Sequence, residues 1–92
     1  MPRYLIEVPH EEKIVACSHA RKVFLDTGSH FLTNADWGCK DGDHKAWIIA
    51  EVDNKEQARA ILPAMYRTRA KIVQLNKFTI DEIDELFRYH RS

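Results

Sequence analysis

The 92-residue sequence predicts an α+β fold in which helices cover one face of an antiparallel sheet. Three observations favour this class: short segments with alternating apolar residues, longer segments with apolar residues at helical spacing, and an Asp-Gly step between two alternating segments. Hydrophobic residues make up 45% of the chain and charged residues 30%, as in globular proteins. The length suits one hydrophobic core, so we expect a single domain over residues 1–92.

The first half of the chain is predicted to form a strand, a helix and a second strand. Residues Arg3–Val8 alternate and are followed by Pro9, which cannot donate to a strand ladder. A helix then runs from Glu11 to about Thr27 and stops at Gly28. Residues 31–37 alternate again, and the sequence KDGD after them predicts a two-residue hairpin turn.

The second half is predicted to add two strands and two helices. Residues 46–52 return from the hairpin. Asn54 with Gln57 three residues later is typical of a helix start, and Pro63 should interrupt that helix. A strand over residues 71–78 precedes the capping-box sequence TIDE and a last helix. The apolar residues of that helix are expected to face inward, namely Ile80, Ile83, Leu86 and Phe87.

This order, βαββαβ plus a C-terminal helix, is the split βαβ or ferredoxin-like plan. Right-handed crossovers then predict the spatial strand order 4-1-3-2, with both main helices on one face of the sheet. That covered face is expected to present alternate residues of the strands, among them Tyr4, Ile6, Val8, Phe31, Trp37, Ala46, Ile48, Val73 and Leu75.

The opposite face of the sheet is expected to be too apolar for a monomer to expose. It should carry Leu5, Leu32, Trp47, Ile49 and Ile72 among its residues. The C-terminal helix could fold over this face. We favour instead a second copy of the chain, stacked sheet to sheet in a homodimer.

Charge and hydropathy exclude several kinds of partner. Fourteen basic residues balance fourteen acidic ones, so no general attraction to nucleic acid or to an anionic membrane is expected. No apolar run approaches the roughly 20 residues of a membrane span, and the N-terminus lacks a signal-peptide pattern. We expect a cytoplasmic protein whose two cysteines, Cys17 and Cys39, are free thiols or metal ligands.

The stretch DWGCKDGDHKAW, residues 36–47, contains the clearest indication of chemistry. A two-residue loop at Asp41-Gly42 would place Cys39 opposite His44, with Cβ atoms about 4.5–5.5 Å apart. The first strand is expected to end at the same end of the sheet, and His10 follows it. The sequence therefore brings together three nitrogen and sulfur donors.

These donors, His10, Cys39 and His44, suit a transition metal such as zinc, nickel, copper or iron. The fourth ligand could be water or an aspartate of the turn. Cys17 is less suitable, because it would lie almost two turns into the predicted helix. Three protein ligands and an open position would favour catalysis or reversible metal carriage.

Two other interpretations of the pair stay open. Cys39 could be a nucleophile with His44 as its base, near a helix N-terminus that lowers the pKa of the thiol. Cys39 could also be a small apolar side chain in the core and His44 a turn residue. Among the other histidines, His19 and His30 are expected in solvent.

A different kind of site is conceivable on the open sheet face. Glu51 has Arg3 opposite it and is expected to form an ion pair, whereas Glu7 has no evident partner. Desolvation would raise the pKa of such a carboxylate and suit it to proton transfer. A dimeric enzyme or a small-ligand-binding protein would then use Glu7 and the Trp47 side. A homodimeric interaction module without catalysis is the third possibility.

The layout resembles the ferredoxin-like, dimeric α+β-barrel superfamily over most of the chain. That superfamily includes cofactor-free monooxygenases, small isomerases and small nickel-binding proteins. The opening MPRYLIEV resembles the first strand of such proteins, and DWGCKDGDH resembles a feature of a small bacterial and archaeal group. The resemblance implies an isomerase or oxygenase type of activity as the enzyme alternative, but fold alone does not assign chemistry.

Overall fold

The computed structural model describes residues 1–90 of the chain. Its strands are β1 (Arg3–Pro9), β2 (Asp36–Trp37), β3 (Lys45–Glu51) and β4 (Lys71–Leu75). Its helices are α1 (Ile14–Asp26), α2 (His30–Thr33), α3 (Lys55–Ala60), α4 (Ala64–Arg67) and α5 (Ile80–His90), and η1 (Cys39–Asp41) is a single 3-10 turn. None of the helices in residues 1–90 is both long and apolar enough to cross a bilayer.

The four strands form one sheet in the order β2-β3-β1-β4. This is the predicted order 4-1-3-2 read from the other edge, and every pairing is antiparallel. Strand β1 lies in the middle, where Ile6 faces Ile48 of β3 and Ile72 of β4. The α+β class and the sheet order are thus confirmed.

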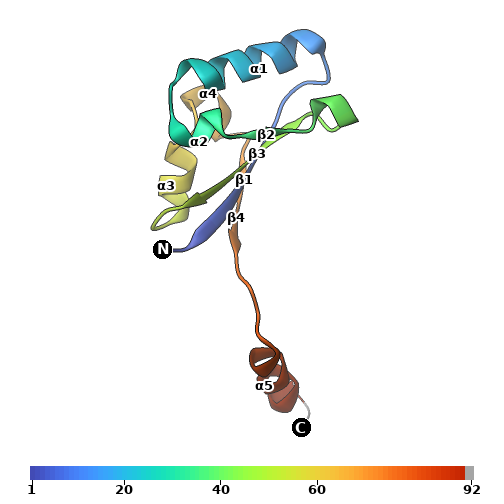
Figure 1. The fold of residues 1–92 in the computed structure, drawn as a ribbon, viewed down its shortest axis with the longest axis vertical. Helices are drawn as coiled ribbons and strands as arrows, with labels where there is room; N and C mark the ends of the chain where they lie inside the picture. The colour runs from blue at the N-terminus through green and yellow to red at the C-terminus, as the bar shows by residue number, and fades with distance from the viewer. Residues whose placement is uncertain (91–92) are drawn as a thin grey trace.

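The hydrophobic core lies between one sheet face and the helices α1 to α4. Tyr4, Ile6 and Val8 of β1 are buried, as are Ala46, Ile48 and Ala50 of β3. Phe24 of α1, Leu32 of α2 and Tyr66 of α4 pack onto them in one cluster. Figure 1 shows these helices gathered around the sheet, with α5 standing apart at the end of an extended segment.

The predicted strand over residues 31–37 is largely wrong. Residues His30–Thr33 form α2 instead, because the Ser29 hydroxyl caps the helix by accepting from the Leu32 amide at 3.4 Å. Leu32 is therefore 2% exposed in the core rather than on the open face. Only Asp36 and Trp37 join the sheet, and Trp37 pairs with Ala46 as the register predicts.

The predicted orientation of β4 is also wrong, by one residue. Ile72 pairs with Ile6 and is 8% exposed, so it belongs to the core. Val73 pairs with Leu5, and both side chains lie on the open face of the sheet together with Leu75. The adjacent apolar residues in KIVQL leave the alternation ambiguous, which explains the error.

The predicted boundaries around Pro63 are confirmed. The Asn54 side chain accepts a hydrogen bond from the Gln57 amide at 2.8 Å and begins α3. Pro63 ends this segment, and the chain resumes as the separate helix α4. This break turns α4 so that Tyr66 packs edge-on against Phe24 of α1.

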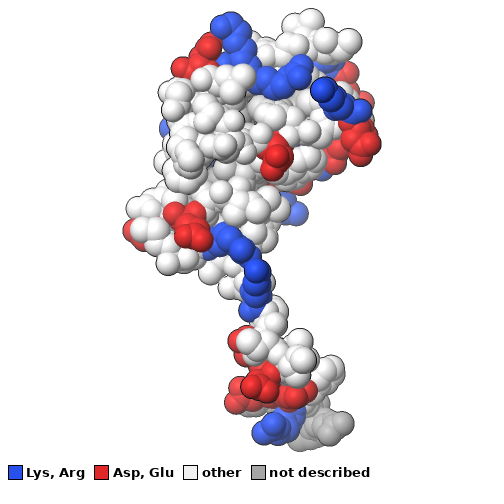
Figure 2. Space-filling view, viewed as in Figure 1, with Lys and Arg blue, Asp and Glu red and all other residues white. Residues whose placement is uncertain are grey.

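The C-terminal helix does not face inward as predicted. The Thr79 hydroxyl accepts from the Glu82 amide at 3.2 Å, which confirms the cap. However, α5 stands apart from the sheet, and Ile80 and Phe87 are 77% and 66% exposed. Figure 2 shows acidic side chains gathered on the same helix. Because the segment after β4 runs outward, the apolar side of α5 has no contact with the core.

Candidate metal centre

His10 is positioned by the loop that follows β1. Its backbone amide donates to the carbonyl oxygen of His44 at 3.0 Å, which joins this loop to the end of the β2–β3 hairpin. The β1–β3 ladder ends one residue earlier, with Pro9 opposite Lys45. The sheet therefore places His10 beside His44, as the sequence predicts.

The end of the hairpin is wider than the predicted two-residue turn. The Gly38 carbonyl accepts from the amides of Asp41 and Asp43, each at 3.0 Å, and the chain between them forms η1. Gly42 closes this turn in the left-handed conformation with φ +83°. Cys39 and His44 are thus not paired in a ladder, but the turn still directs both side chains to the same place.

Cys17 joins these residues from α1. The helix begins at Ile14, with Lys13 as the N-cap residue in extended conformation, so Cys17 lies in the first turns rather than nearly two turns in. Its side chain is 4% exposed and points to the hairpin end. The expected helix start at Glu11 is therefore wrong, and this error hid the fourth donor.

The four side chains form one compact donor cluster. One ligand atom from each of His10, Cys17, Cys39 and His44 lies within 4.8 Å of all the others. Nε2 of His10 lies 2.9 Å from Sγ of Cys17 and 3.1 Å from Sγ of Cys39. Sγ of Cys17 lies 3.2 Å from Nδ1 of His44. We call these four residues the His/Cys cluster.

These distances are close to those of a tetrahedral metal site. With metal–ligand bonds of about 2.0–2.3 Å, neighbouring donors of such a site lie about 3.3–3.8 Å apart. The three contacts above are shorter than this by a few tenths of an ångström. Small side-chain rotations would make room for an ion at the centre of the cluster.

The protonation states of two of these groups are shifted by burial. Desolvation lowers the pKa of His10 below its usual 6.5, and the charges of His44 and Arg21 add to this effect. Desolvation also raises the pKa of the Cys39 thiol, and its contact with Cys17 adds to this. The imidazole of His10 is therefore neutral at neutral pH, with a lone pair available to a metal. A metal must displace the proton of the Cys39 thiol.

The surroundings of the cluster are apolar on one side and open on the other. The Trp37 ring lies 5.9 Å from the ring of His10 and 5.1 Å from that of Phe24, measured between ring centroids. On the open side, a cavity of about 230 Å³ reaches the cluster. It is lined by Ile14, Cys17, Arg21, Cys39, Lys40 and His44. An ion can therefore enter from solvent, and the apolar backing would strengthen its bonds.

Glu7 lies away from this cluster, on the open sheet face. Contrary to expectation it has partners: its carboxylate accepts from Nε1 of Trp47 at 3.1 Å and lies 3.9 Å from Nζ of Lys45. Both partners come from β3, so the carboxylate links β1 to its neighbouring strand. Arg3 and Glu51 do face each other in the register, as predicted.

Three of the four donors were identified in the sequence, and Cys17 was ranked low. One signal in the sequence could have drawn attention to it: Cys17 is one of only two cysteines in the chain. Comparison of the chain with protein-family models, curated proteins and solved structures gives no match.

Proposed function

We propose that this protein binds one transition-metal ion, with zinc as the best candidate, through His10, Cys17, Cys39 and His44. The observation that carries the proposal is the convergence of four ligand atoms within 4.8 Å. Two thiolates and two imidazoles are a common tetrahedral zinc set, and sulfur ligands disfavour magnesium and calcium. Copper, nickel and iron are the competing ions.

Four protein ligands favour a structural role for the ion over a catalytic one. Catalytic zinc keeps an open position for water or substrate, whereas structural zinc is held by four side chains. The ligands come from the loop after β1, from α1 and from the hairpin end. A bound ion would cross-link these three segments.

Elemental analysis of the purified protein tests this proposal. We expect about one zinc per chain after expression with zinc, and its loss in Cys17→Ser and Cys39→Ser. His30→Gln is the matched control, because His30 is exposed and lies outside the cluster. Protein that carries no stoichiometric metal, and that takes up neither zinc, nickel nor copper on titration, would overturn the proposal.

A reducing compartment such as the cytoplasm would keep this site functional. Both cysteines are free in the fold and must stay reduced to act as ligands. The ferredoxin-like assignment is likewise our inference, and the sheet order supports it.

We also infer that two copies of the chain associate through the open sheet face. Ile49 is 60% exposed at a central position of β3, Leu5 of β1 lies opposite it, and Val73 of β4 lies opposite Leu5. The chain carries a second uncovered apolar surface on α5, of which Leu86 is 52% exposed. Packing of these surfaces against a second copy would remove both from water.

A further inference from the structure

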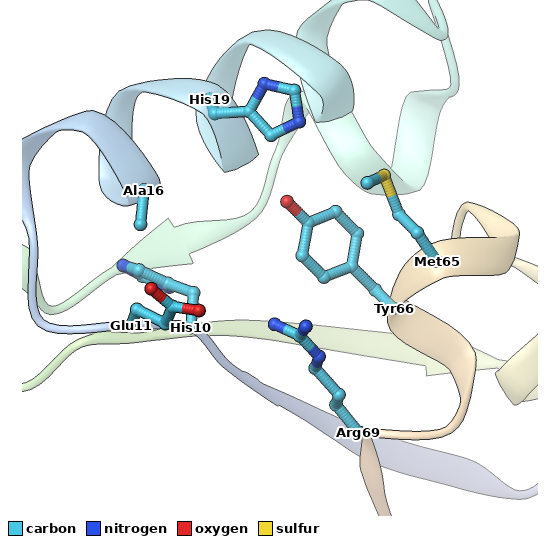
Figure 3. A pocket seen from close by; sticks show the side chains of 7 residues that line it. All are labelled: His10, Glu11, Ala16, His19, Met65, Tyr66 and Arg69. Atoms are coloured by element: carbon cyan, nitrogen blue, oxygen red, sulfur yellow. The ribbon is translucent and has the colours of Figure 1, made fainter.

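A second cavity lies beside the His/Cys cluster, between α1 and α4. Its volume is about 210 Å³, and Figure 3 shows the side chains around it. They are His10, Glu11, Ala16, His19, Met65, Tyr66 and Arg69. Only His10 is shared with the metal centre, so we treat this α1–α4 cleft as a separate site.

Tyr66 provides a hydrogen-bonding group that the protein itself does not use. Its side chain is 4% exposed, yet its hydroxyl has no hydrogen-bond partner within the described residues. Among these residues no sealed side-chain nitrogen or oxygen lacks a partner, so the hydroxyl must be accessible from the cleft. Figure 3 shows it pointing into this space. A donor that has no protein partner and faces the cleft can bind a polar group of a ligand.

Arg69 provides a positive charge in the same cleft. Its guanidinium points into the cleft in Figure 3 and forms no ion pair within the part of the chain that the structure describes. Burial raises the pKa of Tyr66, and the charge of Arg69 partly opposes this. The hydroxyl therefore stays protonated at neutral pH, and the two groups together suit a carboxylate.

Glu11 adds a negative charge at the same opening. Figure 3 shows its carboxylate near the cleft, on the side of the loop after β1. The side chains of Ala16 and Met65 supply apolar walls. A dianion such as phosphate would be repelled by Glu11, whereas a ligand with one carboxylate and one ammonium group complements both charges.

We propose that the α1–α4 cleft binds a small α-amino acid with an apolar side chain. Its carboxylate would contact Arg69 and Tyr66, its ammonium group would contact Glu11, and its side chain would lie against Ala16, above Glu11 in the same lining. The volume of about 210 Å³ is below the roughly 300 Å³ at which sites for drug-sized ligands begin, which limits the ligand to this size. The cleft shares only His10 with the metal centre, and the proposed ligand makes no contact with that residue.

Three related probes test this assignment on the full-length, metal-loaded protein. They are L-leucine, 4-methylpentanoate, which lacks the ammonium group, and isopentylamine, which lacks the carboxylate. Binding is followed by amide chemical-shift changes in NMR spectra. We expect saturable shifts at α1 and α4, with L-leucine bound at least about tenfold more tightly than either partial probe.

Substitutions assign the two ends of the ligand. Tyr66→Phe keeps the packing of the ring. It should lower the affinity for L-leucine and 4-methylpentanoate by about two- to tenfold and leave the affinity for isopentylamine unchanged. Arg69→Gln should lower the affinity for the same two probes more strongly. Glu11→Gln should lower the affinity only for the probes with an ammonium group. Arg88→Gln on α5 is the control and should change nothing.

Two results would overturn the proposal. One is the absence of saturable shifts with L-leucine at millimolar concentrations. The other is equal affinity of L-leucine for the wild type and for Arg69→Gln. Metal content measured on the same samples separates these outcomes from a failure of the metal proposal.

Discussion

Gly38 holds the hairpin end in the shape that directs Cys39 and His44 to the metal centre. A Cβ at this position would lie 2.5 Å from the Asp43 carbonyl oxygen and 2.7 Å from the Trp47 ring. The first of these atoms is backbone, so the turn itself would have to move. We expect Gly38→Ala to lower the free energy of unfolding by about 2–4 kcal/mol.

Gly28→Ala is the matched control for this substitution. Gly28 has a positive φ, +68°, whereas that of Gly38 is −95°, and a Cβ at Gly28 meets nothing within 4 Å. It should cost only the backbone strain of about 1–2 kcal/mol. Urea unfolding of both variants compares them, and equal losses would contradict the role given to Gly38.

The lowered pKa of His10 predicts how the metal-free protein responds to pH. The folded state binds a proton at His10 less readily than the unfolded state does, chiefly because burial disfavours the charged ring. The free energy of unfolding should therefore fall as pH drops through the usual value of 6.5 and level off below the folded-state pKa.

Urea unfolding in the presence of a chelator, at a series of pH values, measures this dependence. His10→Gln should remove the part of this pH dependence that comes from His10, while His30→Gln should leave the dependence unchanged. A wild-type and a His10→Gln protein with the same pH dependence would show that His10 is not the group responsible.

Cys17 shows the limit of the sequence at the scale of single residues. Its type and its place on the buried side of α1 could be predicted, and both are confirmed. Its membership in the cluster could not, because it depends on a helix start three residues later than Glu11. A start three residues later leaves Cys17 on the same side of the helix but brings it about 4.5 Å closer, along the axis, to the helix start and the loop that carries His10.

The elements that meet at the cluster should depend on the ion for their order. The loop after β1, the start of α1 and the hairpin end share few hydrogen bonds apart from the His10–His44 contact. We expect removal of the metal to raise amide exchange in residues 10–18 and 38–44. Exchange in the β1–β3 ladder should change much less.

Hydrogen-exchange mass spectrometry with and without a chelator makes this comparison. Residues 54–60, which lie far from the cluster in sequence and are capped by Asn54, serve as the internal reference. Equal protection with and without metal at residues 10–18 would contradict the cross-linking role.

Helix starts and breaks could be predicted where a single residue determines the local backbone. Asn54, Pro63 and Thr79 act through their own backbone neighbours, so the helix starts and the break that they predict are confirmed. The strand prediction for residues 30–37 was wrong because their alternation fits a strand as well as it fits the short helix that Ser29 caps. The predicted inward orientation of α5 was wrong because no local sequence feature specifies what covers its apolar side.

At the scale of the whole molecule, large apolar side chains lie exposed on two surfaces within residues 1–90, among them Ile49 on the sheet and Phe87 on α5. The open sheet face and α5 are the two parts concerned, and we propose that a second copy covers them. A stable interface of this kind would bury about 1,200–2,000 Å². Light scattering after size exclusion should therefore give a dimer mass.

Ile49→Lys tests the surface directly, because a charge at the centre of the open face would have to be buried in the dimer. We expect this variant to be monomeric but folded. Val15→Lys, at a residue that is 79% exposed on α1, should remain dimeric. A wild type that is monomeric at micromolar concentrations would contradict the proposed association.

X-ray absorption spectroscopy of the zinc-loaded protein identifies the atoms that bind the ion. We predict two sulfur ligands at about 2.3 Å and two nitrogen ligands at about 2.0–2.1 Å, with one sulfur lost in any Cys17→Ser protein that still binds zinc. A first shell of nitrogen and oxygen atoms alone would contradict the His/Cys cluster as the metal centre.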